Sequence, residues 1–137
     1  MMKIVVDANI WIAAMFNRRS SSRRIIELAR AGEVEIIWCA RIRQEIERML
    51  ATTARASGRQ PGDLAAPGFK PENRVECRTR VDVVKTDPAD NKYFSCAIDG
   101  GAELIVSNDS DLLGVRTYRG VQVLTAPETL EWIKDRG

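Results

Sequence analysis

Acidic residues follow two apolar runs of the sequence, at positions where a carboxylate could do chemistry. Asp7 comes directly after the run 4–6, which is typical of a parallel strand buried on both faces. Asp109 and Asp111 follow a similar run at 103–106. Open α/β sheets bind their ligands at the carboxyl ends of such strands. The alternatives are that Asp7 only caps the next helix and that Asp109 and Asp111 only belong to a polar turn.

A third acid, Glu45, lies within an expected long helix at 40–56. The apolar residues of that helix have helical spacing and form a core-facing stripe of Ile42, Ile46 and Met49. Glu45 occupies a position of this stripe, where a carboxylate is costly unless it meets a partner or a metal. The alternative is that it reaches water at the stripe edge or pairs with Arg41 or Arg48.

A fourth acid, Asp90, heads the apolar stripe of a helix expected to begin at Asp87-Pro88 and to run to about Ile98. Asp87 is also a candidate N-cap, with Asp90 as the acid of a capping box. A carboxylate of a first turn can cap and still reach a metal. Because Asp109 and Asp111 are two residues apart, an extended chain predicts one ligand and one supporting acid.

Several carboxylates that converge on one point repel one another and resist full ionisation. A divalent cation removes this conflict. A set of oxygen ligands without His or paired Cys favours Mg²⁺ or Mn²⁺. Such a centre activates water and stabilises charge on a phosphate.

The composition excludes several other chemistries. The chain has no His, which rules out Ser-His-Asp and Cys-His catalysis and the usual zinc sites. Its three cysteines, Cys39, Cys77 and Cys96, have no C-x-x-C spacing. We therefore expect reduced thiols, with neither a disulfide framework nor a zinc cluster.

Basic residues are concentrated in two stretches, 18–30 and 41–59, although the net charge is only +2. Arg guanidinium groups suit phosphate, so these stretches supply candidates for phosphate contact. The alternative is that they form solvated helix faces. The candidates are Arg18, Arg19, Arg23, Arg41 and Arg43.

Strand and helix patterns alternate along the chain, which predicts parallel pairing with right-handed crossovers. Strands are expected at 3–6, 34–38, 103–106 and 121–124, and helices at 10–16, 20–31, 40–56, 87–98 and 127–134. The 137 residues predict a single domain, with a Gly/Pro-containing excursion at about 57–80. No apolar run approaches the roughly 20 residues of a membrane helix, and the N-terminus does not resemble a signal peptide. We therefore expect a cytoplasmic protein.

The order of these motifs resembles PIN-domain ribonucleases. The resemblance rests on Val6-Asp7-Ala8-Asn9, on Glu45 within a helix, and on two later segments, Asp87-Pro88-Ala89-Asp90-Asn91-Lys92 and Ser107-Asn108-Asp109-Ser110-Asp111-Leu112. It covers nearly the whole chain except about 57–80. More narrowly, the sequence is similar to the toxins of bacterial and archaeal toxin–antitoxin pairs, and segment 119–125 also fits that group.

The resemblance implies a PIN-like three-layer α/β/α sandwich with a central, mostly parallel sheet. It implies a Mg²⁺- or Mn²⁺-dependent endoribonuclease that often forms a homodimer and is silenced by a cognate antitoxin. The acidic metal-binding residues would be Asp7, Glu45, Asp90 and Asp109, with Asp111 substituting for or supporting Asp109. Asn9 and Ser107 would orient substrate or support the ligands.

Two other functions stay open at this point. A module that keeps the fold but only binds RNA or protein would look similar in sequence. An aspartate-dependent phosphatase of the haloacid-dehalogenase type is less favoured, because such enzymes want a second Asp two residues after the first. This chain has Asn9 there.

Overall fold

A five-stranded, mostly parallel sheet forms the centre of the protein. The computed structural model describes residues 2–59 and 68–136. The strands follow the order β2-β1-β3-β5-β4 across the sheet. They are β1 (Lys3–Val6), β2 (Glu35–Ile36), β3 (Leu104–Val106), β4 (Thr117–Tyr118) and β5 (Val121–Leu124). Only β4 is antiparallel to its neighbour, so the carboxyl ends of the other four strands share one edge.

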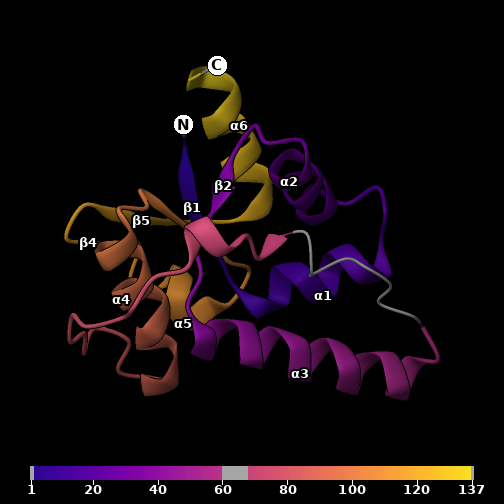
Figure 1. Ribbon diagram of the computed structural model, residues 1–137, viewed down its shortest axis with the longest axis horizontal. Coiled ribbons are helices and arrows are strands. Elements are labelled where there is room, and N and C mark those ends of the chain that lie inside the picture. The colour runs from indigo at the N-terminus through magenta and orange to yellow at the C-terminus, as the bar shows by residue number, and fades with distance from the viewer. Residues whose placement is uncertain (1, 60–67, 137) are drawn as a thin grey trace.

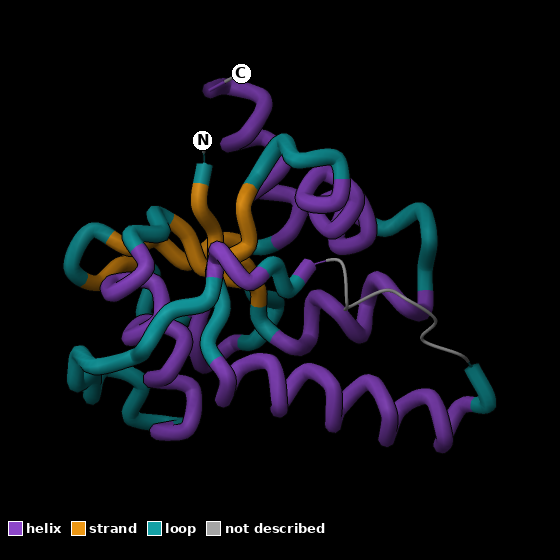
Figure 2. Tube along the Cα trace, in the orientation of Figure 1, coloured by secondary structure: helices purple, strands orange, loops and turns teal. Residues whose placement is uncertain are grey.

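Helices cover both faces of this sheet and give an α/β/α sandwich (Figures 1 and 2). One group contains α1, α2 and α6, in which α2 packs against both of the others, and α3 packs against α1. On the sheet itself, α4 packs against β1, β3 and β5. The bounds are α1 (Ala8–Phe16), α2 (Ser21–Arg30), α3 (Ala40–Ser57), α4 (Asn91–Gly100), α5 (Ser110–Leu113) and α6 (Ala126–Arg136).

The central strands are buried on both faces, as their uninterrupted apolar runs predict. Every residue of β3 is buried, as are the three residues of β1 that precede Asp7. The expected stripe of α3 is also present, because Ile42 and Ile46 are buried in the core and Met49 packs against it. These strands and α3 fix the backbone on which the candidate acids stand.

Two elements differ from the sequence expectation. The strand expected at 34–38 pairs only over β2, and Trp38 instead forms an isolated bridge with Arg74. The indole of Trp38 donates a hydrogen bond to the carbonyl of Lys70, 2.8 Å away. The antiparallel strand β4 was not predicted. It joins β5 through Arg119 and Gly120, both at positive φ, as a tight two-residue hairpin requires.

Part of the excursion expected at about 57–80 can be compared with the structure. Residues 60–67 of it lie outside the described residues. Residues 68–80 contain a short 3₁₀ turn at Pro71–Asn73. Phe69 is buried between Trp11 and Trp38, with ring centroids 5.4 and 5.5 Å away. In the described part of the chain, no helix is long and apolar enough to cross a membrane.

Candidate metal centre

Asp7 stands at the point where β1 ends and α1 begins. It occupies the N-cap position of α1, yet its side chain makes no capping hydrogen bond. The carboxylate instead accepts a hydrogen bond from the hydroxyl of Ser107, with Oγ and Oδ2 2.7 Å apart. The side chain of Asp7 is therefore directed toward the end of β3, and helix capping does not explain it.

Ser107 connects the ends of two neighbouring strands. It follows β3 and is fully buried. Its hydroxyl donates to Asp7 and accepts from the backbone N–H of Asp109, 2.9 Å away. Asp109 in turn caps α5, because its Oδ1 accepts from the N–H of Asp111 at 3.0 Å. One serine thus ties the carboxylate of β1 to the acidic turn after β3.

Four aspartates surround the same region. Asp87, Asp90, Asp109 and Asp111 each have a carboxylate oxygen within 4.8 Å of the others. Our expectation that only one of Asp109 and Asp111 faces the cluster is wrong, because the chain there is the first turn of α5 and is not extended. Asp87 was read only as a helix cap. It makes no capping hydrogen bond with its side chain, so the capping box is also wrong.

Asp90 is the most constrained member of this cluster. The residue is only 7% exposed, and the Oδ2 of its carboxylate has no hydrogen-bond partner among the described residues. Burial, a hydrogen bond with Asp109 and the charges of Asp87 and Asp7 raise the pKa of Asp90 to about 7. Burial also raises the pKa of Asp7, against the hydrogen bonds from Ser107 and Tyr93. No cationic group is among the causes of either shift, so ionisation of both carboxyl groups is unfavourable.

Glu45 reaches the site from α3 and is held by two residues of α4. It accepts a hydrogen bond from the ammonium of Lys92 at 2.7 Å and another from the hydroxyl of Tyr93. The Lys92 side chain is 8% exposed and that of Glu45 20%. The alternative pairing of Glu45 with Arg41 or Arg48 is wrong, because its ion pair is with Lys92. Lys92 and Tyr93 directly follow Asp90 and Asn91 in the sequence, and this proximity to a candidate acid was the sequence feature that could have indicated their role.

Tyr93 is the link between Glu45 and Asp7. Its ring is fully buried, and the backbone N–H of Ala8 approaches its hydroxyl oxygen at 3.5 Å. Burial and the charge of Asp7, with the hydrogen bond to Glu45, raise the pKa of Tyr93. Its hydroxyl therefore keeps its proton and remains a donor to carboxylate.

The remaining candidate residues are Asn9 and the five arginines, and they differ in exposure and in their partners. Asn9 is exposed in the first turn of α1. Arg41 lines a groove of about 450 Å³ together with Arg48, Glu45 and Lys92. The other arginines have different surroundings: Arg18 and Arg19 are exposed beyond the far end of α1, Arg23 pairs with Glu27, and Arg43 stacks on Trp38 and Phe69 and pairs with Glu47.

These donors fit a hard divalent cation. They are all oxygens, they converge from the turn after β3 and from the turn before α4, and the buried Oδ2 of Asp90 has no partner among the described residues. Asp87, Asp90, Asp109 and Asp111 would hold the ion, with Asp7 beside them. Such oxygen sets select Mg²⁺ or Mn²⁺ over softer metals.

Comparison with known proteins defines the class of this α/β/α protein with an acidic centre. A model of the PIN domain matches residues 3–111, and the chain therefore belongs to the PIN-domain family. The crystal structure of PAE2754 from Pyrobaculum aerophilum superposes with a TM-score of 0.60, covering 98% of this chain and 90% of that one at 16% identity. That likeness shows a shared fold. The comparison with curated proteins finds no match.

The raised pKa of Asp90 predicts that the metal-free protein loses stability as the pH rises. The carboxyl ionises near its ordinary value of 3.8 when the chain is unfolded and near 7 when it is folded. The folded state binds the proton more tightly, so stability falls between about pH 4 and pH 7 and then levels off. Asp90→Asn should be more stable than wild type at pH 8 by about 1 kcal/mol or more, and similar at pH 4.

Urea denaturation in EDTA measures this difference. Asp82→Asn is the matched control, because Asp82 is exposed and pairs only with Lys85 at the surface. Added Mg²⁺ should stabilise wild type more than Asp90→Asn. Parallel pH profiles for wild type and Asp90→Asn would contradict the interpretation.

Proposed function

We propose that this protein is a metal-dependent endoribonuclease that hydrolyses RNA phosphodiesters. The observation that carries the proposal is the unpartnered, buried Oδ2 of Asp90 within a cluster of four aspartates. PIN domains are generally metal-dependent nucleases, and the family match agrees with this donor set. A bound Mg²⁺ or Mn²⁺ would supply an activated water and neutralise charge on the phosphate.

The residues of this chain divide the remaining work. Asp90, Asp109 and Asp111, with Asp87, bind the ion through carboxylate oxygens. Ser107 holds the Asp7 carboxylate in one orientation, and Tyr93 holds that of Glu45. Asp7 and Glu45 are then placed to accept a proton or to orient the attacking water. Lys92 balances the charge of Glu45 beside the site.

The groove beside Glu45 supports RNA as the substrate. Arg41, Arg48 and Lys92 line it, and guanidinium groups bind phosphate through paired N–H donors. A single strand that follows this groove would bring a phosphodiester toward the acids. We propose that the protein acts on this substrate in the cytoplasm.

We expect RNA cleavage by the purified protein with Mg²⁺ or Mn²⁺, and none in EDTA. Asp7→Asn should reduce kcat by at least about 100-fold, because it removes a charge next to the ion without changing shape. Asp82→Asn should cleave as wild type does. The measurement is gel analysis of end-labelled RNA.

Three outcomes would overturn this function. Cleavage that survives EDTA or Asp7→Asn would exclude the proposed centre. Calorimetric Mg²⁺ binding without cleavage of any RNA would favour a non-catalytic binding module. A covalent aspartyl-phosphate would favour the phosphatase.

The arginines of the groove should act on RNA binding rather than on the chemical step. The double variant Arg41→Gln/Arg48→Gln should weaken RNA binding about tenfold at physiological salt and lower the salt slope by about 1 to 2. kcat at saturating RNA should change little. Lys134→Gln is the matched control, because the end of α6 lies at the opposite edge of the sheet, where Arg136 pairs with Glu103. Equal weakening by Lys134→Gln would contradict a specific groove.

We further propose that the nuclease is the toxin of a toxin–antitoxin pair, acting as a homodimer that a cognate antitoxin protein silences. The support is the sequence resemblance of the motifs around Asp7, Glu45, Asp90 and Asp109. A small reading frame upstream that encodes a DNA-binding protein would support it further.

Expression of the protein in bacteria should therefore stop growth, and Asp7→Asn should not. Co-expression of the upstream protein should restore growth and yield a stable complex, measured by growth curves and size-exclusion chromatography. Growth arrest that persists in Asp7→Asn, or normal growth with an active nuclease, would contradict the toxin role.

A further inference from the structure

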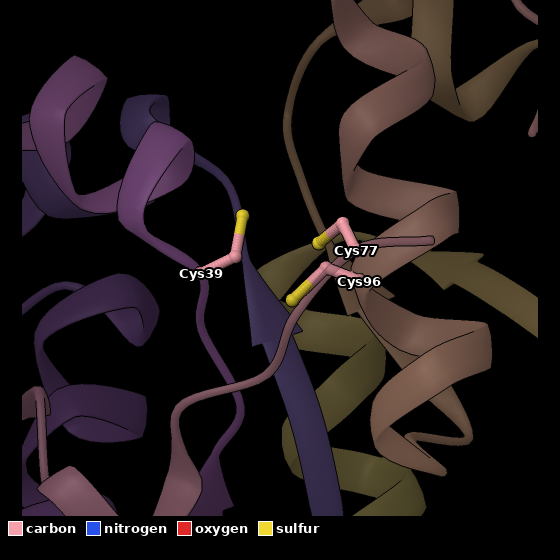
Figure 3. A group of neighbouring side chains, drawn as sticks. All are labelled: Cys39, Cys77 and Cys96. Atoms are coloured by element: carbon pink, nitrogen blue, oxygen red, sulfur yellow. The ribbon is translucent and has the colours of Figure 1, made fainter. Parts of the chain in front are cut away.

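The three cysteines of the chain meet at one point and form a group that shares no residue with the acidic cluster. Their sulfur atoms all lie within 4.8 Å of one another. Figure 3 shows Cys77 and Cys96 pointing toward the side on which Cys39 lies. All three thiols are free, and Cys39 and Cys96 are buried. The expected reduced thiols are present, and the fold brings them together from three distant segments although their spacing in the sequence gives no sign of it.

Each cysteine is held in place by its neighbours. Cys39 is the N-cap residue of α3, and the N–H of Val75 donates to the carbonyl of Trp38, 2.8 Å away, which brings the chain near Cys77 alongside it. Cys96 lies in the middle of α4. The N–H groups of Arg78 and Thr79 both donate to Asp99 of the same helix. These hydrogen bonds, none of which involves sulfur, hold the segment around Cys77 against α3 and α4.

A basic pocket opens onto the cluster. It has a volume of about 320 Å³, and Cys39 and Cys77 form part of its wall. Its charged lining residues are cationic: Arg41, Arg78, Arg80 and Lys92. Three thiolates around a divalent cation carry a net charge of −1, which these cations would offset.

We propose that Cys39, Cys77 and Cys96 form a binding site for one Zn²⁺ ion, with its fourth position open to the basic pocket. Zinc–sulfur bonds of about 2.3 Å in a tetrahedron place sulfur atoms about 3.8 Å apart, which lies within the 4.8 Å that bounds their separations here. Water or a small anion from the pocket would complete the shell. Binding takes place through thiolates, so remaining thiol protons leave to solvent.

The charge state of the cluster agrees with this assignment. Hydrogen bonds from the other two thiols lower the pKa of Cys39, and N–H groups at the start of α3 lower it further. Contacts with Cys39 raise the pKa of Cys77 and of Cys96. A cation bound between the three sulfur atoms would replace the thiol protons that remain on them.

Cobalt is the probe that separates this site from the carboxylates. The full chain, reduced and stripped of metal, is titrated with Co²⁺ in excess Mg²⁺. We expect one equivalent per chain, a sulfur-to-cobalt charge-transfer band and the intense visible bands of tetrahedral cobalt. Zn²⁺ should bleach them. Carboxylates give no sulfur band, so the result is independent of nuclease activity.

Cys77→Ser tests the ligands, because Cys77 is the least buried of the three. Loss of a supporting group costs 10- to 100-fold in affinity, so loss of a ligand should cost at least about 100-fold. Glu76→Gln, at an exposed neighbouring position, should bind as wild type does. Zn²⁺ should also slow alkylation of Cys77 in wild type at least about tenfold, which needs no variant.

Absence of a sulfur band in the folded wild-type protein, or a band unchanged by Cys77→Ser, would overturn the proposal. The cysteines would then be small apolar side chains of the core. Unchanged alkylation in the presence of Zn²⁺ would lead to the same conclusion.

Discussion

Mutual repulsion among buried carboxylates is the constraint on which the carboxyl edge of this sheet depends. Asp7 and Asp90 are both removed from water, which raises the pKa of each, and neighbouring carboxylates raise both pKa values further. The buried residues of β1 and β3 form an apolar base beneath these acids. Polar compensation comes from few groups, chiefly the hydroxyl of Ser107. A cation is the one species that would satisfy all of the acids together.

Glu45 solves the same problem in a different way. Its charge is balanced within the protein by Lys92, and Tyr93 fills the space between it and Asp7. Both partners stand on α4, whereas Glu45 stands on α3, so this contact also joins two helices. Both oxygens of Glu45 already have a partner, because Lys92 donates to Oε2 and Tyr93 to Oε1. Glu45 therefore differs from Asp90, whose Oδ2 has no hydrogen-bond partner among the described residues.

The sequence predicts those features that local patterns determine. Asp7 and Asp109 were found because an apolar run ends at a strand terminus, and Glu45 because a charge interrupts a helical stripe. Asp87 was missed, since Pro88 makes a capping residue the simpler interpretation. The pairing of Glu45 with Lys92 and the meeting of the cysteines depend on how α3, α4 and segment 74–79 pack. No spacing rule contains that information, because the partners are 47 residues apart in the first case.

The two clusters share the same supporting elements but differ in their donor atoms. Cys39 is the N-cap residue of α3 and Glu45 lies in that helix, while Lys92 and Cys96 both lie on α4. Hard oxygen donors favour Mg²⁺ or Mn²⁺, and soft sulfur donors favour Zn²⁺, so neither site would compete strongly for the ion of the other. A metal on the thiols would tie the start of α3 to α4 and so restrict Glu45 relative to Lys92. The position of one catalytic candidate would then depend on a bond formed outside the acidic centre.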